Sequence, residues 1–415
     1  MSAFLDQAHA IARRICRDAI WSDGFCNWVG PFIDSMNVWD VRHKSFGPDL
    51  YSGTSGVALF LAAAAQSGGD RLVRKTAEGA ARHAYRHAAE FAPALSSGVY
   101  SGKLGIAWAL VRIGELLEEP AWTELGIAML EELPPELPGS GLDLMSGYAG
   151  AIPVLLDLSH RCAHPVWIDL AERWGDKLEG AAVKSSEGWS WKTIELPANV
   201  AARNLTGFSH GTAGIGWAFL ELHAATGEPR FRTAADEAFR YERTFYSPEH
   251  ENWPDFRDYL RPPGGPSGPI FGTAWCHGAP GIALSRIRAW RLTGSAEARA
   301  ETEIAIRTTQ RALETPEALR IGFSLCHGCA GNADVLLEAA RELEAPALRE
   351  TAERIGQAGI EQFEAQRLTW PCGLPGAGET KNLMLGTAGI GYFYLRLGNP
   401  ALTTVLMIGG SAIRT

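Results

Sequence analysis

Two kinds of segment alternate along the chain. Short segments that are apolar on nearly every side occur at residues 57–65, 106–117, 215–223 and 390–397. Longer segments that carry many charges on one face follow, at residues 71–91, 165–182, 296–314 and 347–366. A helix that is apolar all round is buried, whereas an amphipathic helix covers a core with one face. The pattern predicts pairs of helices, each with a buried inner member and a half-exposed outer member.

A short glycine motif, G-x-x-G, precedes each apolar segment and repeats seven times. Its paired glycines are Gly53/Gly56, Gly102/Gly105, Gly147/Gly150, Gly211/Gly214, Gly278/Gly281, Gly328/Gly331 and Gly386/Gly389. The first glycines are 45 to 67 residues apart. One such motif carries little information in a chain with 46 glycines. Seven at a near-regular spacing indicate an internal repeat, with glycine where the chain turns inward and packs closely.

The repeat predicts an all-α fold, an (α/α) toroid of seven inner and seven outer helices, because no single pair buries its own apolar face. We expect one domain over residues 1–415, with residues 1–50 as an N-terminal helical extension that packs on the toroid. Strand signals are minor, and residues 188–193 are the one segment expected to form a small β element. The proline- and glycine-rich loop at 261–268 lies within one repeat.

Composition narrows the class of protein. The apolar fraction is 46%, the charged fraction 20% and the net charge −9, which fits a globular protein and argues against nucleic-acid binding. No export signal is recognised at the N-terminus, and the apolar run 57–65 is too short to span a bilayer. Seven cysteines, an odd number, favour reduced thiols. We therefore expect a cytoplasmic protein with no transmembrane segment.

Aligning the repeats on their first glycine brings out candidate metal ligands. The residue before that glycine is His210, His277 and His327 in three consecutive repeats, and the residue two before it is Cys276 and Cys326 in two of them. Equivalent positions of a closed ring lie around one mouth of the barrel, so these side chains should converge there. Thiol and imidazole groups are ligands that Zn²⁺ prefers. Spacing alone leaves four candidate ligands open: Cys276, His277, Cys326 and His327. Two adjacent Cys-His pairs do not easily bind one ion, so we do not expect all four to be ligands.

Three motifs make the chain resemble the lanthionine synthetase C-like family. They are Gly-Phe-Ser-His-Gly-Thr-Ala-Gly at 207–214, Trp-Cys-His-Gly-Ala-Pro-Gly at 275–281 and Ser-Leu-Cys-His-Gly-Cys-Ala-Gly at 324–331. The resemblance extends from about residue 51 to the last repeat, and the second motif looks most like the cyclase domains of class II lanthionine synthetases. It implies an α/α toroid with a zinc site.

The resemblance also implies roles for individual residues. Zinc would be bound by Cys276, Cys326 and His327, with a fourth position left for water and then a substrate thiol. His210 would be the catalytic histidine, and Asp143, four residues before the third repeat's glycine, would support it. Some members have an arginine where this chain has Gly272, so no arginine role carries over. Some have tyrosine where this chain has His277, which leaves His277 as an alternative proton donor.

The implied activity is a zinc-dependent Michael-type addition of peptide cysteine thiols to dehydroalanine or dehydrobutyrine, giving lanthionine or methyllanthionine thioethers. The partner would be a dehydrated precursor peptide, prepared by separate dehydratase or kinase enzymes of the same pathway. Two alternatives use the same zinc motifs. One is addition of glutathione or another thiol to dehydrated residues, and the other is a non-catalytic, zinc-stabilised scaffold that binds a peptide. The predicted presence of His210 and Asp143 at the mouth favours catalysis over the scaffold.

Overall fold

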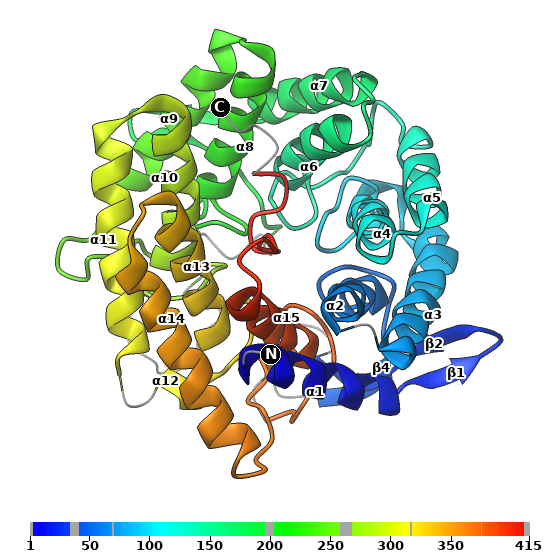
Figure 1. Cartoon of the computed structure of the whole chain (residues 1–415). Helices are drawn as coiled ribbons and strands as arrows, with labels where there is room; N and C mark the ends of the chain where they lie inside the picture. The colour runs from blue at the N-terminus through cyan, green and yellow to red at the C-terminus, as the bar shows by residue number, and fades with distance from the viewer. Residues whose placement is uncertain are drawn as a thin grey trace.

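The structure is a computed structural model that describes residues 3–33, 41–68, 70–195, 203–257, 268–315, 318–374 and 376–410. Within these ranges, seven helices form an inner ring and seven an outer ring (Figure 1). The inner helices are α2 (Thr54–Gly68), α4 (Lys103–Leu117), α6 (Tyr148–Arg161), α8 (Thr212–Thr226), α10 (Ala279–Thr293), α13 (Cys329–Glu342) and α15 (Thr387–Gly398). The outer helices are α1 (Ala3–Arg17), α3 (Arg71–His87), α5 (Pro120–Glu131), α7 (Val166–Gly180), α9 (Pro229–Thr244), α11 (Ala296–Leu313) and α14 (Pro346–Gly359). The predicted all-α toroid is confirmed.

The ring closes where helices from the two ends of the chain pack against each other. Each inner helix packs against its neighbours in the ring, and α15 packs on α2. Among the described residues, no helix follows α15 in sequence, and α1 packs on α15 as the other outer helices pack on their inner helices. The N-terminal helix is therefore the seventh outer helix, which explains why its apolar stripe, including Ile11 and Ile15, is buried. No helix in the described part of the chain is long and apolar enough to cross a membrane.

The expectation that residues 1–50 are helical is wrong beyond α1. Strands β1 (Ile20–Ser22) and β2 (Phe25–Asn27) form one hairpin, and β3 (Val29–Ile33) and β4 (Val41–Ser45) form another. Asp23-Gly24 turns the first hairpin, with both residues at positive φ as a two-residue hairpin loop requires. Elsewhere β5 (Val183–Ser185) pairs with β6 (Gly188–Ser190), so the small β element expected at 188–193 is present but ends at Ser190. The loop at 261–268 lies almost wholly outside the described residues.

The glycine motif sits inside the start of each inner helix, so the predicted helix starts after the motif were about three residues late. The helix begins directly after the first glycine. A Cβ on the second glycine would lie 1.6–2.2 Å from the carbonyl oxygen six residues earlier in every repeat, for example 1.6 Å at Gly105. The incoming loop thus lies directly on the first helical turn, and only glycine leaves room for it.

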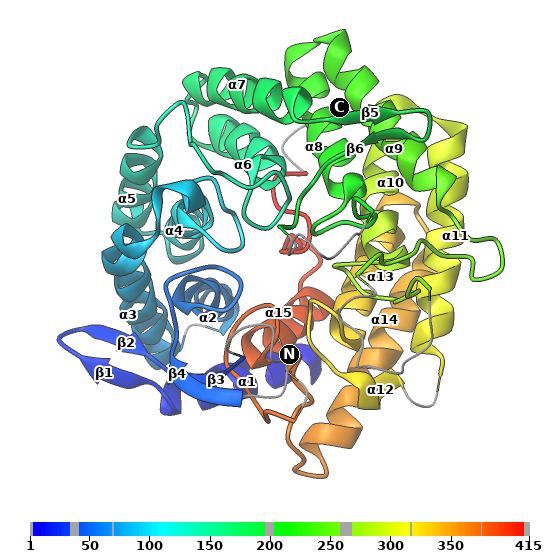
Figure 2. The ribbon, with the colours of Figure 1, turned by 180° about the vertical axis from the view of Figure 1, so that it is seen from behind.

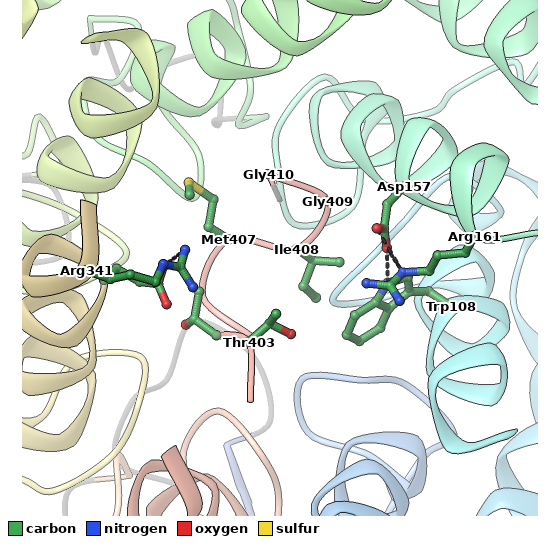
Figure 3. Close-up of a pocket in the computed structure, with 11 residues that line it drawn as sticks. Trp108, Asp157, Arg161, Arg341, Thr403, Met407, Ile408, Gly409 and Gly410 are labelled. Atoms are coloured by element: carbon green, nitrogen blue, oxygen red, sulfur yellow. Dashed lines mark hydrogen bonds and ion pairs between the residues drawn. The ribbon is translucent and has the colours of Figure 1, made fainter. Parts of the chain in front are cut away.

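The C-terminal segment after α15 fills the middle of the toroid near the carboxyl ends of the inner helices (Figure 1). Tyr100 Oη donates a hydrogen bond to the Val405 carbonyl, and Trp275 Nε1 to that of Leu406, both at 2.7 Å. Figure 3 shows this segment crossing between the inner helices, beside a small cavity that Trp108 and Arg161 also line. The opposite end of the ring carries the loops that lead into α8, α10 and α13 (Figure 2).

Candidate metal and proton-transfer site

Three of the predicted ligands meet where the loops before α10 and α13 adjoin. One ligand atom each of Cys276, Cys326 and His327 lies within 4.8 Å of the other two. Cys276 lies two residues before Gly278, the N-cap of α10, and Cys326 lies two residues before Gly328, the N-cap of α13. The repeat therefore places the two thiols side by side, as its frame predicts. His277 is outside this cluster, which reduces the four open candidates to three.

The imidazole of His327 is held in one orientation by the backbone. Its Nε2 lies 2.8 Å from the carbonyl oxygen of Gly373, so Nε2 carries the proton and Nδ1 is the nitrogen left to bind a metal. A Cβ on Gly373 would stand 2.8 Å from that same Nε2. The loop that carries Gly373 is itself tied down, because Gly373 N–H donates to the Leu385 carbonyl at 2.8 Å. Such a hydrogen bond behind a metal-binding histidine fixes the tautomer and the ring.

The donor set fits zinc. Two sulfurs and one nitrogen match the ligands of a zinc site that keeps one position open. Ligands about 2.1–2.3 Å from a tetrahedral zinc lie about 3.5–3.8 Å apart, so movements of about an ångström would bring these atoms onto one ion. Hydrogen bonds from Cys326 and His327 hold the pKa of Cys276 well below its ordinary value. The same hydrogen bond raises the pKa of Cys326 well above its ordinary value, so the cluster favours a thiolate on Cys276, the form that metal binding requires.

His210 and Asp143 form a second group at the same mouth. His210 Nδ1 lies 2.5 Å from Asp143 Oδ2, with the His210 side chain 29% exposed and the Asp143 side chain 4% exposed. The other oxygen, Oδ1, accepts hydrogen bonds from Ser146 N at 2.9 Å and Ser146 Oγ at 3.1 Å. Asp143 thus both builds the turn before α6 and orients the histidine. A histidine held through Nδ1 presents Nε2 for proton transfer.

Asp49 provides an internal comparison for Asp143. It stands four residues before the first repeat's glycine, and its Oδ1 accepts from Ser52 N at 2.7 Å and from Ser52 Oγ at 3.1 Å. The turn therefore recurs in the first and third repeats, and of these two aspartates Asp143 is the one bonded to a histidine. Burial raises the pKa of Asp49.

The loop that carries His210 is bonded directly to the metal cluster. The N–H groups of Phe208 and Ser209 donate to the Cys276 carbonyl at 3.3 and 3.1 Å. From the outer helix α9, buried Glu242 accepts from Gly207 N–H at 3.0 Å and from Thr212 Oγ1 at 2.6 Å. Burial raises the pKa of Glu242 to about 7. The histidine and one thiol are consequently held by a single hydrogen-bonded unit.

His277 is more deeply buried than its neighbour His210, and its surroundings favour the neutral form of the imidazole. It is 3% exposed, and neither ring nitrogen has a hydrogen-bond partner among the described residues. Its Nδ1 lies 4.0 Å from Asp255 Oδ1, and its ring centroid lies 6.0 Å from that of His210. Burial, together with the charge of Arg257, lowers its pKa to about 4. Of the two histidines, His210 is the one that is partly exposed and paired with an acid.

Three supporting residues were missed by the sequence analysis. Tyr51 occupies the same frame position as the two cysteines, and burial followed by the nearby thiols raises its pKa well above the ordinary value, so it stays a neutral hydrogen-bond donor. Its position in the repeat could have indicated that it lies near Cys276 and Cys326. Gly373 and Glu242 lie outside the frame, and nothing local in the sequence marks them.

Comparison with known proteins identifies the family. Residues 44–408 match the sequence profile of the family described as "Lanthionine synthetase C-like protein". The chain belongs to this family. Among solved structures it is similar to nisin cyclase, with a TM-score of 0.69 and 16% identity over 89% of this chain and 94% of that chain. It is also similar to a GH76 α-mannanase from Bacteroides thetaiotaomicron, with a TM-score of 0.53 and 9% identity over 96% of each chain. No curated protein sequence matches the chain significantly.

Proposed function

We propose that this protein is a zinc-dependent lanthipeptide cyclase that adds peptide cysteine thiols to dehydroalanine or dehydrobutyrine. The observation that carries the proposal is the meeting of Cys276, Cys326 and His327 within 4.8 Å at the mouth that also holds the His210–Asp143 pair. Family membership supports it, and the structural likeness to nisin cyclase supports the fold on which it rests. The dehydrated peptide would come from separate enzymes of the same pathway, in the cytoplasm.

The reaction forms one C–S bond and leaves the composition of the peptide unchanged. The thiolate attacks the β-carbon of the dehydrated residue, the C=C electron pair moves to give an enolate, and a proton is added at the α-carbon. The proton lost by the thiol balances the proton gained by the α-carbon. When bound by the three side chains, zinc would hold the attacking cysteine as a thiolate at a pH below its ordinary pKa of about 8.5.

His210 is the proposed proton donor. Its Nδ1 is engaged by Asp143, which leaves Nε2 to give a proton to the enolate and to recover one afterwards. Asp143 stabilises the protonated ring and holds its orientation, and Asp143 itself is fixed by Ser146. His277 is the weaker candidate because its buried ring, with a pKa of about 4, is neutral near pH 7 and has no imidazolium proton to give.

The C-terminal segment packs against the loops of the site from inside the ring. Val405 and Leu406 are buried in the middle of the ring below the loops. Hydrogen bonds from Tyr100 and Trp275 hold this segment in place, and Trp275 directly precedes the proposed ligand Cys276. We propose that the peptide approaches from the mouth that carries the glycine motifs.

The test is ring closure measured by thiol counting. The zinc-loaded protein would be incubated with a peptide containing one dehydroalanine and one cysteine, then with an alkylating reagent. Cyclisation leaves the mass unchanged, so loss of the alkylatable thiol reports product in mass spectrometry. The proposal expects closure that disappears after zinc removal and returns when zinc is restored. Equal closure without zinc, or consumption of added glutathione in place of the peptide thiol, would contradict it.

A further inference from the structure

The loops before the inner helices form a ring of their own. In each repeat, one residue lies two positions before the first glycine: Tyr51, Tyr100, Met145, Ser209, Cys276, Cys326 and Met384. We call the meeting of two such consecutive positions a junction. Because the repeats close into a circle, there are seven junctions, the last one between Met384 and Tyr51.

Six junctions are closed by main-chain hydrogen bonds that end on the carbonyl of the next position. The bonds are Tyr51 N to Tyr100 O at 2.9 Å, Tyr100 N to Met145 O at 2.9 Å, Leu144 N to Ser209 O at 3.1 Å, Ser209 N to Cys276 O at 3.1 Å, Cys326 N to Met384 O at 2.9 Å and Met384 N to Tyr51 O at 3.0 Å. The donor is the N–H of the equivalent position in five cases and of its neighbour in the sixth. This is one interaction repeated around the mouth.

The seventh junction, between Cys276 and Cys326, differs. Within the described ranges, no main-chain hydrogen bond joins these two residues. The loops are linked there by side chains: Asn332 Nδ2 donates to the Thr273 carbonyl at 3.0 Å, and the Cys276 thiol is hydrogen-bonded to Cys326 and His327. The two positions that lack the main-chain bond are the two that carry thiols, and these thiols lie within 4.8 Å of each other. Where the backbone leaves the ring open, the side chains offer metal ligands.

We propose that the metal has a second role in this protein: it is the seventh tie of the mouth, joining the loops before α10 and α13 where the main chain does not. This inference rests on the proposed metal site but does not depend on the cyclase reaction. His327 strengthens the tie, since it adds a second ligand from the α13 loop and is itself anchored through Gly373 to the loop before α15.

A physical consequence is local. Proteins open in units whose stability follows their own contacts, so a junction held by side-chain bonds without a main-chain bond opens more readily than its neighbours. A ligand that binds only the closed form stabilises it by RT ln(1 + L/Kd), where L is the free ligand concentration. Metal removal should therefore loosen the Cys276–Cys326 junction selectively and leave the rest of the ring, with its six main-chain ties, closed.

Amide hydrogen exchange read by mass spectrometry tests this on the full-length protein. Exchange would be compared between zinc-loaded protein and protein stripped by a chelator, in reducing buffer that prevents a disulfide. We expect exchange in peptides covering 271–281 and 322–331 to rise at least tenfold without zinc. Peptides covering the junctions at 49–56 and 98–105 should change less than twofold.

Matched variants separate the tie from general damage. Cys276→Ser should reproduce the zinc-free exchange pattern even with zinc present, whereas Cys372→Ser, which alters a thiol outside the cluster, should keep the zinc-loaded pattern. An even rise across all seven junctions, or no rise at 271–281 and 322–331, would overturn the proposal. Zinc content, measured on the same samples, keeps the two ideas apart. Protein that binds zinc and shows the local protection without cyclising a peptide would sink the proposed function and leave the tie standing.

Discussion

Cys276 belongs to two neighbouring junctions that are held in different ways. On the side of α8, its carbonyl accepts hydrogen bonds from Phe208 N and Ser209 N, and from Ser209 Oγ at 3.2 Å. On the side of α13, its thiol faces Cys326 and His327 with no main-chain bond across the gap. The first junction is complete from the protein alone. The second has the chemistry to be completed by a metal.

The difference suggests how the repeat builds the proposed catalytic site. Six junctions keep the ordinary backbone tie, and one exchanges it for two sulfurs. Because both junctions share Cys276, the loop that carries His210 is fixed relative to the metal cluster by bonds of about 3 Å to the same residue. The ring itself thus sets the positions of the proposed proton donor and of the proposed thiol site. Five changes would sharpen or break this comparison.

Loss of a ligand at the metal junction should have the largest effect. Cys326→Ala removes one of two sulfurs, and cyclisation should fall by about 10³-fold or more, as expected when a metal contributing several kcal/mol is lost. The zinc content, measured by elemental analysis, should fall with it. Cys329→Ala is the matched control, because this buried thiol at the start of α13 donates to the Ala318 carbonyl and is not in the cluster. Full zinc retention by Cys326→Ala would exclude Cys326 as a ligand.

A change in the hydrogen-bonded unit should separate chemistry from metal binding. His210→Asn should slow ring closure by about 10²–10⁴-fold, the usual contribution of a general acid. Zinc content should stay at the parental value, because His210 is outside the cluster. His277→Asn should slow the reaction less, since its buried ring is neutral. A His210→Asn variant that closes rings at the parental rate would rule out the proton-donor role.

The anchor behind His327 should show an intermediate effect. Gly373→Ala would place a Cβ 2.8 Å from His327 Nε2 and disturb the bond to the Gly373 carbonyl. Zinc affinity, measured by competition with a chromophoric chelator, should weaken by about 10–100-fold. Gly376→Ala in the same stretch has open space around it and serves as a control, although its positive φ adds local strain. Unchanged affinity in Gly373→Ala would show that the histidine needs no such anchor.

Glu242 should make the α8 side of the comparison sensitive to pH. Its folded pKa is about 7 against an ordinary 4.5, so the folded protein keeps a proton that the unfolded chain releases above pH 4.5. The group therefore lowers the free energy of unfolding as pH rises from about 4.5 to 7, by roughly 2–3 kcal/mol. Glu242→Gln should remove this slope, as judged by urea unfolding at pH 5 and pH 8. Parallel pH profiles for the two proteins would contradict it.

The smallest effect is expected where main-chain bonds remain. Ser209→Ala deletes one of three hydrogen bonds to the Cys276 carbonyl and leaves both N–H donors. The free energy of unfolding should fall by about 0.5–1.5 kcal/mol. Zinc affinity should be unchanged, since the sulfur is not touched. A tenfold weaker zinc affinity would mean that the two junctions are coupled more tightly than their separate bonds suggest.

The sequence predicted the ring because the signal was periodic. The glycine motif gives the number of repeats, and its frame predicts that Cys276, Cys326 and His210 lie at one mouth. The reason for the second glycine, contact with a carbonyl six residues earlier, explains why the motif recurs. The seventh outer helix was not recognised as such, because α1 and α15 are brought together by ring closure and not by proximity in sequence.

Other features could not be read from the chain. Gly373 and Glu242 act through a carbonyl and a buried carboxylate from segments outside the frame, and neither stands in a motif. The Asp-Gly pair at residues 23 and 24 is a typical hairpin turn, and the prediction of a helical extension over residues 1–50 did not take it into account. The missing main-chain bond between Cys276 and Cys326 is visible only once all seven junctions can be compared.

X-ray absorption at the zinc edge tests the account most directly. In zinc-loaded protein without peptide, the spectrum should show two sulfur neighbours at about 2.3 Å together with lighter ligands. Adding a dehydrated peptide with one free cysteine, in the slow His210→Asn variant, should raise the count to three sulfurs. Protein that binds no zinc, or a zinc ion whose sulfur count stays the same when the peptide is bound, would contradict the account.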